Sequence, residues 1–528
     1  MTTNLLMKIK LLLLLFLASL SSFGQDTFIP DINFENKLIA LGIDSGVPDG
    51  KVLTAKINTL TSLDVSSSSI SDLTGIQNFS ALTYLNCNKN QLLSLDVSKN
   101  TALTSLDCSY NKLSNLDVSK NTSLTLLYCY LNQLSGLNVV LNTALTYLAC
   151  GQNAITSLDV TKNTSLIYLS CGINQLTSLN IASNTALKTL ECHQNILTNL
   201  NVSTNTALTS LNCRVNELIG LNITKNIALT SLDCSSNRLT NLDFAKNIAL
   251  TSLNCGFNEL NNLDITTNTA LISLECGGNL LNILNVSKNT ALKTLDCENN
   301  LLTNLDISKN IALTSLICGD NKLSSLDVSK NTALTTLYCT LNELTSLDVS
   351  KNASLTNLRC NTNKFTSLDV SKNTALTSLH CSNNPLLNSL NLKNGKNTLI
   401  GTGKIKIFYN PNLSCIQVDD VAYSNTNWST AKDATASYSL NCPSLDISES
   451  VFNTIALYPN PSKGEVYIDN ITLEKATIYD ALGKLVKTTK FVGDSNNNTI
   501  NLAGSPSGIY YIYLEREGAT VVKKIILE

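Results

Sequence analysis

The chain has 528 residues, of which 43% are hydrophobic, 14% charged and 5% aromatic. Lysine and arginine number 37 against 39 acidic residues, so the formal net charge is −2 at pH 7. This balance excludes a strongly basic nucleic-acid-binding protein and gives no reason to expect an anionic membrane partner. Two histidines, His193 and His380, leave little material for metal sites or acid–base catalysis, so we expect no metal and no cofactor.

The first residues have the layout of a secretory signal peptide. Lys8 and Lys10 precede an apolar run, 11–20, and small residues follow. We expect cleavage before Gln25, so that residues 1–24 are the signal peptide. The apolar run is too short to span a bilayer well, and no later stretch has the length and apolar character of a transmembrane helix. No cysteine lies near the cleavage point, which argues against a lipoprotein anchor.

Residues 25–59 have the composition of a cap for the repeats that follow them. Phe34, Leu38 and Leu41 lie at helical spacing, and Gly42 follows as a helix stop. The sequence therefore predicts a short helix in this N-terminal cap. A stack of repeats has an open end that such a segment must cover.

A 21-residue repeat fills the longest part of the chain. Residues 81–101 (ALTYLNCNKNQLLSLDVSKNT) align on 102–122 (ALTSLDCSYNKLSNLDVSKNT), and the register continues without a gap. Fifteen units cover 81–395, and 60–80 form a degenerate entry unit. Such a fixed period is the signature of a repeat architecture.

Every unit carries the same apolar spacing. The first reads Leu82-x-x-Leu85-x-Cys87-x-x-Asn90-x-Leu92. This pattern resembles the leucine-rich repeat, L-x-x-L-x-L-x-x-N/C-x-L, with cysteine at the third apolar position. The resemblance implies a solenoid of stacked coils.

Alternation within a unit predicts two short strands. Leu85 and Cys87 alternate with polar positions, and Leu95 and Val97 do the same in the second half-turn. One unit cannot bury its own apolar face, so neighbouring units must stack. We therefore expect a mostly β, flattened solenoid of low curvature over 60–395, with about 16 coils and short strands on both faces.

The repeated cysteines and asparagines are expected to point inward. Fifteen of the seventeen cysteines recur every 21 residues, from Cys87 to Cys381. We expect buried free thiols, because in-register stacking orients the side chains poorly for a disulfide; some disulfides, or a metal, are the alternatives. Asparagine recurs at position 90 and position 100 of the units, where its amide can bond backbone groups of its own and adjacent coils.

The outward positions of the first half-turn vary most among the repeats. Large apolar or aromatic residues recur there at Tyr128, Tyr130, Leu131, Tyr147, Phe257, Tyr338 and Leu341. A series of exposed large apolar residues is typical of an interaction surface, and tyrosine is a favoured interface anchor. We expect this face to bind a protein or a glycan. Neutral drift on a surface without a partner is the alternative.

No catalytic motif is recognisable in the sequence. H-E-x-x-H, G-x-S-x-G and a glycine-rich phosphate loop are all missing, so we expect no enzymatic activity. Two functions stay open: a secreted or surface-displayed recognition protein of the adhesin type, and a structural surface or matrix spacer without a specific ligand. Ice binding by the threonine row that begins at Thr83 is weaker, because Ile167 and Lys188 interrupt the row.

Residues 396–446 lose the period. Cys415 and Cys442 flank a polar stretch that contains Trp428. We expect one disulfide that closes a C-terminal cap, worth about 3–4 kcal/mol on a chain-entropy estimate. Two unpaired thiols are the alternative. The polar residues 447–454 are expected to be a linker.

From residue 455 on, short β-type runs alternate with turns. The runs are 456–458, 465–468, 476–479, 485–488, 499–502, 508–514 and 521–527. Proline, asparagine and glycine punctuate them. Seven short strands in about 75 residues predict a small antiparallel β-sandwich.

Four motifs in this segment resemble the type A C-terminal sorting domain of the Bacteroidota type IX (Por) secretion system. They begin at Leu457 (LYPNPSKG), Ile478 (IYDALGK), Ser507 (SGIYYIY) and Val522 (VKKII). Residues 455–528 thus resemble this sorting domain, and the residues that carry the resemblance include Tyr458, Pro459, Asn460, Pro461, Gly464, Gly483 and Gly508. It implies export through both membranes, with the type IX machinery and a sortase-like peptidase as partners.

The family commonly releases its passenger or attaches it to surface lipopolysaccharide. The resemblance therefore implies a protein that is secreted or held at the outer-membrane cell surface of a Gram-negative bacterium.

Overall fold

The computed structural model describes residues 25–442, 455–469, 471–491, 498–516 and 519–528. The expected signal peptide and the linker 447–454 lie outside these residues. The chain divides into two compact units near residue 440, and each is described by itself. Within the described ranges, no helix has the length and apolar character needed to cross a membrane.

A small sheet and a helix begin the first unit. The elements are β1 (Asp26–Phe28), α2 (Ile32–Ala40), β2 (Lys51–Leu53), α3 (Thr54–Ile57) and the 3-10 turn η1 (Ile76–Asn78). Asp31 caps α2, because its side chain accepts hydrogen bonds from the backbone N–H groups of Asn33 and Phe34 at 2.8 and 3.0 Å. Gly42 follows the helix with a left-handed φ of 71°, which glycine adopts without strain. The predicted short helix is therefore present.

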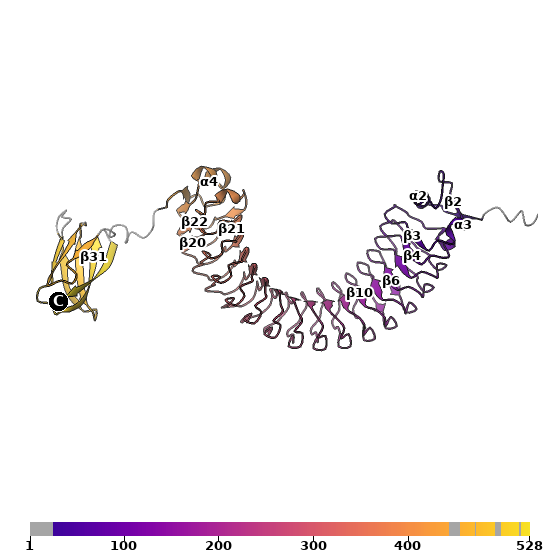
Figure 1. The fold of residues 1–528 in the computed structure, drawn as a ribbon, viewed down its shortest axis with the longest axis horizontal. Coiled ribbons are helices and arrows are strands. Elements are labelled where there is room, and N and C mark those ends of the chain that lie inside the picture. Colours follow the sequence, from indigo (N-terminus) through magenta and orange to yellow (C-terminus); the bar gives the residue numbers. More distant parts are fainter. Residues whose placement is uncertain (1–24, 443–454, 470, 492–497, 517–518) are drawn as a thin grey trace, which may run out of the picture. The chain divides into compact units, whose positions relative to one another are not determined.

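The first half-turns of the coils form one parallel sheet. Its strands are β3 (Ser62–Asp64), β4 (Tyr84–Asn86), β5 (Ser105–Asp107), β6 (Leu126–Tyr128), β8 (Tyr147–Ala149), β10 (Tyr168–Ser170), β11 (Thr189–Glu191), β12 (Ser210–Asn212), β13 (Ser231–Asp233), β14 (Ser252–Asn254), β15 (Ser273–Glu275), β16 (Thr294–Asp296), β17 (Ser315–Ile317), β18 (Thr336–Tyr338), β19 (Asn357–Arg359), β21 (Ser378–His380) and β23 (Ile405–Lys406). Adjacent coils pair in step, as Leu85 does with Leu106. These strands line the inner, concave side of an arc (Figure 1).

Strands on the second, convex face are few. They are β7 (Leu137–Asn138), β9 (Leu158–Asp159), β20 (Ser367–Asp369), β22 (Ser389–Asn391), β24 (Cys415–Gln417) and β25 (Ser437–Ser439). The arc of Figure 1 is more curved than the low curvature that we expected from the sequence. Coils that pair in step about 4.8 Å apart along the concave side of an arc must splay on its convex side, which disfavours a continuous convex ladder.

The strand ladder continues past residue 395, where the 21-residue period ends. Leu379 of β21 pairs with Ile405 of β23, and Leu390 of β22 pairs with Ile416 of β24. The predicted leucine-rich solenoid with units of about 21 residues is confirmed, but it has about 18 turns rather than about 16, because these last coils lack the sequence period.

The last coils close the open end of the solenoid. The 3-10 turn η2 (Asn397–Leu399) and the helix α4 (Val421–Asn427) lie there. Trp428 is buried in the solenoid core, and its indole Nε1 donates to the carbonyl of Ile400 at 3.1 Å. Cys415 and Cys442 are disulfide-bonded.

The interior of the solenoid is one continuous apolar core. The repeat leucines are buried, and all fifteen repeat cysteines are buried free thiols. Burial raises their pKa values, for Cys150 to about 12. The structure therefore agrees with the expectation that the repeat cysteines are buried free thiols.

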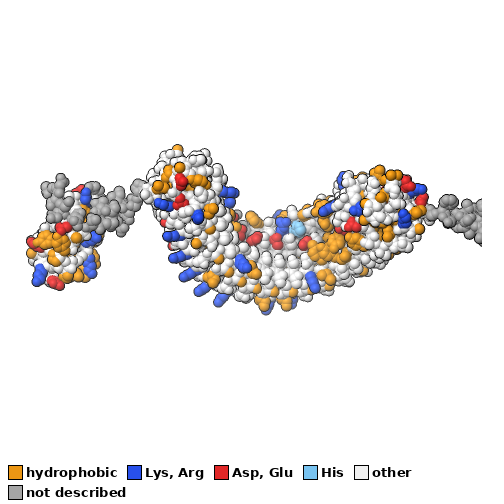
Figure 2. Space-filling view, turned by 45° about the horizontal axis from the view of Figure 1, so that its top comes forward, with side chains coloured by type: hydrophobic (Ala, Val, Ile, Leu, Met, Phe, Trp, Pro, Cys, Tyr) orange, Lys and Arg blue, Asp and Glu red, His pale blue; other side chains and the backbone are white. Residues whose placement is uncertain are grey.

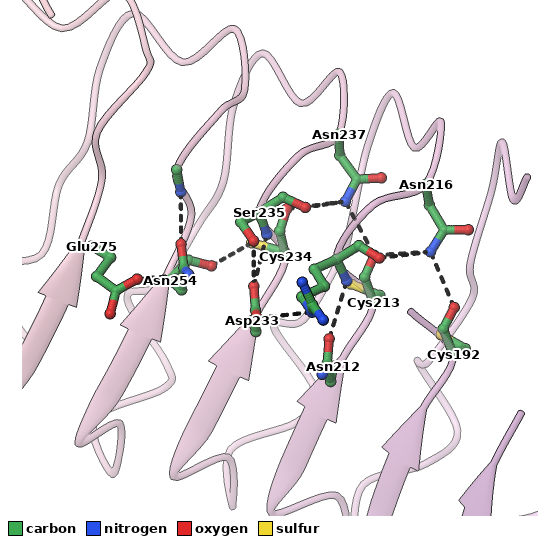
Figure 3. A network of polar contacts seen from close by, with 12 residues as sticks. Cys192, Asn212, Cys213, Asn216, Asp233, Cys234, Ser235, Asn237, Asn254 and Glu275 are labelled. Carbon is green, nitrogen blue, oxygen red and sulfur yellow. Dashed lines mark hydrogen bonds and ion pairs between the residues drawn. The ribbon is translucent and has the colours of Figure 1, made fainter. Parts of the chain in front are cut away.

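Two rows of buried asparagines hold the corners of the coils. Asn237 Nδ2 donates to the carbonyls of Cys213, in the preceding coil, and Cys234, in its own, at 3.1 and 3.0 Å (Figure 3). Its Oδ1 accepts the Leu218 N–H at 3.0 Å. In the second row, Asn226 Nδ2 donates to two backbone carbonyls at 3.0 and 2.9 Å. The predicted role of these asparagines is confirmed.

The second unit is a two-sheet sandwich. One sheet contains β26 (Ala456–Tyr458), β27 (Glu465–Asp469) and β30 (Asn498–Asn501), and the other contains β28 (Lys475–Asp480), β29 (Leu485–Lys490), β31 (Gly508–Arg516) and β32 (Ala519–Leu527). All strand pairs within them are antiparallel. Val466, Ile478 and Ile512 lie in one core that both sheets share. The seven strands expected from the sequence are present.

Candidate functional site

The turn after each concave strand holds one residue in the left-handed conformation. Ile173, Val215 and Phe257 occupy this position with φ of 55°, 53° and 53°. For a residue other than glycine this conformation costs about 1–2 kcal/mol, and β-branched residues tolerate it worst. Large apolar side chains at this position therefore cost stability without filling the core. That cost indicates a role for them on the surface.

Tyrosines from adjacent coils lie in contact on the concave face. The rings of Tyr128 and Tyr147 have centroids 4.9 Å apart, and those of Tyr147 and Tyr168 stack at 4.1 Å with an interplanar angle of 3°. Tyr110 and Tyr130 meet edge-to-face at 5.4 Å. Such pairs add about 0.5–1.5 kcal/mol each beyond the area that they bury.

These five tyrosines and Leu131 line one groove of about 360 Å³. Its floor includes Gly151 and Gly172. A Cβ at residue 172 would lie 2.5 Å from the His193 ring, and one at residue 151 would lie 2.8 Å from the Gly172 carbonyl oxygen. The two glycines therefore keep the groove open. Figure 2 shows apolar side chains gathered on this inner wall, toward the end that carries the N-terminal cap.

The last coil that lines the groove contributes Glu191 and His193. The Tyr168 hydroxyl donates to Glu191 Oε2 at 2.9 Å. Burial, together with this hydrogen bond, raises the pKa of the Tyr168 phenol. Burial and the nearby Arg214 lower the pKa of His193. At neutral pH the imidazole of His193 is therefore uncharged.

Further along the same face, carboxylates crowd together. Asp233 lies 4.0 Å from Arg214, and the Asn254 amide donates to Glu275 at 2.9 Å (Figure 3). Burial, then neighbouring carboxylates, raise the pKa values of Glu275 and Glu298. Within the described residues, no group of three or more His, Cys, Asp or Glu side chains is arranged to hold a metal ion.

The predicted site residues divide into three places. Tyr128, Tyr130, Leu131 and Tyr147 meet in the groove. Phe257 is 67% exposed and lies apart from them, beside Gly278. Tyr338 ends strand β18 of a later coil and Leu341 lies in the turn after it. The Arg359 guanidinium lies 4.4 Å from the Tyr338 ring centroid.

Sequence reasoning missed Tyr110, Tyr168 and Glu191. A signal for them was available, because Tyr147 and Tyr168 occupy the same position of consecutive units and both point outward on their strands. Residues 21 positions apart in a stacked repeat are lateral neighbours. Reading each outward position down the coils, rather than along one unit, would have found the tyrosine stack.

In the second unit, the motif residues mostly hold the sandwich together. Asn460 joins its loop to β32, because its Nδ2 donates to the Lys524 carbonyl at 3.0 Å and its Oδ1 accepts the Ile526 N–H at 2.9 Å. The Tyr458 hydroxyl donates to Asp469. Pro459 and Pro461 flank Asn460, and both follow cis peptide bonds.

The motif glycines lie at turns and at one strand end. Gly464 (φ 129°) lies against the backbone of Ala503, where a Cβ would come within 3.1 Å. Gly483 (φ 79°) lies in the turn between β28 and β29 that Asp480 stabilises. Gly508 begins β31. A glycine is needed at 464 because of both its φ and its close neighbour.

Comparison with known protein families identifies the second unit. Residues 456–528 match the family described as the secretion system C-terminal sorting domain. The chain ends in a type IX secretion sorting domain. This sorting domain indicates export by the type IX system, an interaction with its machinery, and secretion or attachment at the cell surface.

The solenoid is similar to internalins. Over 74 residues, 14% of this chain, it is 40% identical to Internalin J of Listeria monocytogenes, and that match spans 8% of the relative's length. The solved functional domain of that protein, described as including a cysteine ladder, matches with a TM-score of 0.62 at 29% identity, covering 96% of this chain and 99% of that one.

A leucine-rich-repeat protein of Leptospira interrogans shares the fold, with a TM-score of 0.58 at 22% identity over 70% of this chain and 97% of that one. The leucine-rich-repeat fold and the sorting domain together point to a non-catalytic binding or surface protein.

Proposed function

We propose that this protein is an exported recognition protein that binds a protein or a glycan through the concave face of its solenoid. The observation that carries the proposal is the tyrosine groove that Tyr128, Tyr147 and Tyr168 form. Aromatic clusters with a few polar groups at one end are common in binding sites. The strained apolar residues in the adjacent turns support the same surface.

The test measures binding of the full chain to a glycan array and to surface proteins isolated from the organism's habitat. We expect Tyr128→Ala with Tyr130→Ala to weaken retention of any ligand found by about tenfold, as for interface hot spots. Tyr338→Ala then reports whether the second group of predicted residues takes part. A ligand retained equally by all variants would remove the concave face from the proposal. The lack of any ligand would favour the structural spacer.

The route of export extends the proposal. In the secretion family, the sorting domain is removed by a sortase-like peptidase, and we infer the same here, in a bacterium of the Bacteroidota, with release or attachment to surface lipopolysaccharide. Mass spectrometry of the native protein in cell-surface and medium fractions is the test. We expect a first residue at Gln25 and loss of the sequence after about residue 455. An intact C-terminus in the mature protein would contradict this route.

A further inference from the structure

The tyrosine groove has the properties of a site for a positively charged group. Its lining offers the faces and edges of five tyrosines from consecutive coils, with the Glu191 carboxylate at one end. Aromatic faces attract cations through the ring quadrupole, by about 0.5–2 kcal/mol depending on desolvation. In the described structure no lysine or arginine lines this groove. His193, which does, has its pKa lowered by burial and adds no charge at neutral pH.

The same chain shows how its tyrosines hold cations. Further along the concave face, the guanidinium of Arg359 lies 4.4 Å from the centroid of the Tyr338 ring. At the edge of the groove, Lys89 Nζ lies 5.7 Å from the Tyr110 ring. Among the described residues, Tyr128, Tyr147 and Tyr168 have no cation over their rings. The Tyr147 ring lies between those of Tyr128 and Tyr168, so the ring faces without a cation are the outer faces of Tyr128 and Tyr168.

Four carboxylates lie on the coils beyond the groove, and one basic residue, Arg214, lies between them and the groove, near His193. The next coils present Asp233, Glu275, Asp296 and Glu298, and only Asp233 has a basic partner within 4.0 Å in the described structure. Burial raises the pKa values of Glu275, Asp296 and Glu298, and neighbouring carboxylates add to the effect at Glu275 and Glu298. Approach of a basic ligand would relieve this crowding.

We propose that the tyrosine groove binds an arginine or lysine side chain of a protein ligand, with the head group against the tyrosine rings and paired with Glu191. The inference rests on the proposed function, since it names the chemistry of the ligand at the same site. Arginine fits best, because its planar guanidinium stacks on aromatic rings and pairs with a carboxylate at the same time. The carboxylates of the following coils accept further basic residues of the same ligand.

The test compares two peptides that differ in charge alone. The full chain is titrated with a capped peptide of six arginines and with the same peptide built from six citrullines, at two salt concentrations. We expect binding of the citrulline peptide to be at least about tenfold weaker. Chitohexaose serves as a neutral glycan probe in the same assay.

The variants are chosen to preserve the fold. Glu191→Gln keeps an acceptor for the Tyr168 hydroxyl and removes only the charge, and Tyr147→Leu removes a ring whereas Tyr147→Phe keeps it. We expect the first two to weaken arginine-peptide binding by about fivefold or more, and Tyr147→Phe by less than about twofold. Asp264→Asn removes an equal charge from the second half-turn and should weaken binding by no more than about twofold.

Equal binding of the two peptides would overturn the inference, as would equal effects of Glu191→Gln and Asp264→Asn, which would indicate only a general acidic attraction. If chitohexaose binds, Tyr147→Leu abolishes that binding and the arginine peptide does not bind, the groove is a glycan site. The proposed function would then stand while this inference falls. If neither probe binds, the inference also falls, and the array and surface-protein experiment decides the proposed function separately.

Discussion

Asparagine occupies two buried positions in each coil, and the two positions use their amides differently. Asn237 bonds four backbone groups with both ends of its amide: three carbonyls through Nδ2 and the Leu218 N–H through Oδ1. Asn226 satisfies two carbonyls through Nδ2, and its buried Oδ1 has no hydrogen-bond partner among the described residues. Buried polar groups cost most when a partner is removed, so the two residues should differ in their contribution to stability.

We predict that Asn237→Ala destabilises the solenoid by about 3 kcal/mol and Asn226→Ala by about 1–2 kcal/mol. The first change leaves the Leu218 N–H without a partner. It also removes one of the two asparagine donors that the carbonyls of Cys213 and Cys234 each accept. The second removes two hydrogen bonds but leaves both carbonyls with a backbone partner, and it removes an oxygen that was itself unsatisfied. Urea denaturation of each variant measures the difference. Equal losses of stability in the two variants would show that a water molecule already donates a hydrogen bond to Asn226 Oδ1.

The partly buried carboxyl group of Asp296 also affects the stability of the solenoid. Burial raises its pKa, so its charge opposes folding at neutral pH. Because the pKa of this carboxyl is higher in the folded than in the unfolded protein, its contribution to stability is fully present below the unfolded-state pKa, near 3.9. That contribution is lost as the pH rises through the folded-state pKa. Asn212 and Asn254 occupy the equivalent place and cap the same turn, at 3.3 and 3.1 Å, so asparagine fits there.

We therefore predict that Asp296→Asn stabilises the protein by about 0.5 kcal/mol at pH 7, and that the gain disappears near pH 4. Thermal unfolding of both proteins across this pH range is the measurement. A gain that does not depend on pH would assign the effect to packing.

At the scale of the element, each strand places a leucine and a cysteine inside and two residues on the concave face. Leu211 and Cys213 of one coil are buried, while Ser210 before them and Asn212 between them are half-buried. Because the coils pair in step, each inward cysteine lies over the next one. The row of thiols is thus a consequence of strand alternation and register together.

We predict that a thiol reagent at pH 8 finds no reactive repeat cysteine in the folded protein, since the reactive thiolate is suppressed by burial and by raised pKa values such as about 12 for Cys213. Unfolding without reductant should expose fifteen thiols, and reduction should raise the number to seventeen. Fewer than fifteen before reduction would indicate disulfides within the row.

At the scale of the molecule, the solenoid is a one-dimensional stack in which a coil contacts mainly its two neighbours. Strand β13 pairs with β12 before it and β14 after it. The stability of such a stack is approximately a sum over units and their interfaces. Removing one whole unit should therefore leave the others paired as before.

We predict that deletion of residues 228–248, one complete unit with β13, gives a folded protein that is shorter along the arc by about 4.8 Å. Leu211 and Leu253 should then become neighbours. Deletion of 228–237 is the control: it breaks the phase and should lower the melting temperature strongly. Circular dichroism and small-angle scattering compare the two. A complete-unit deletion that fails to fold would show that the coils depend on contacts beyond their neighbours.

The sequence by itself determined the coil. Its 21-residue period and its two-residue alternation are local properties, and together they place Leu85 and Cys87 inside, Asn90 at a corner, and seven strands in the sorting domain. Only the tertiary structure decided the curvature, the coils past residue 395 and the groove. These depend on how coils splay and on which outward positions meet: Tyr147 and Tyr168 are 21 residues apart in sequence, and the parallel ladder brings them face to face.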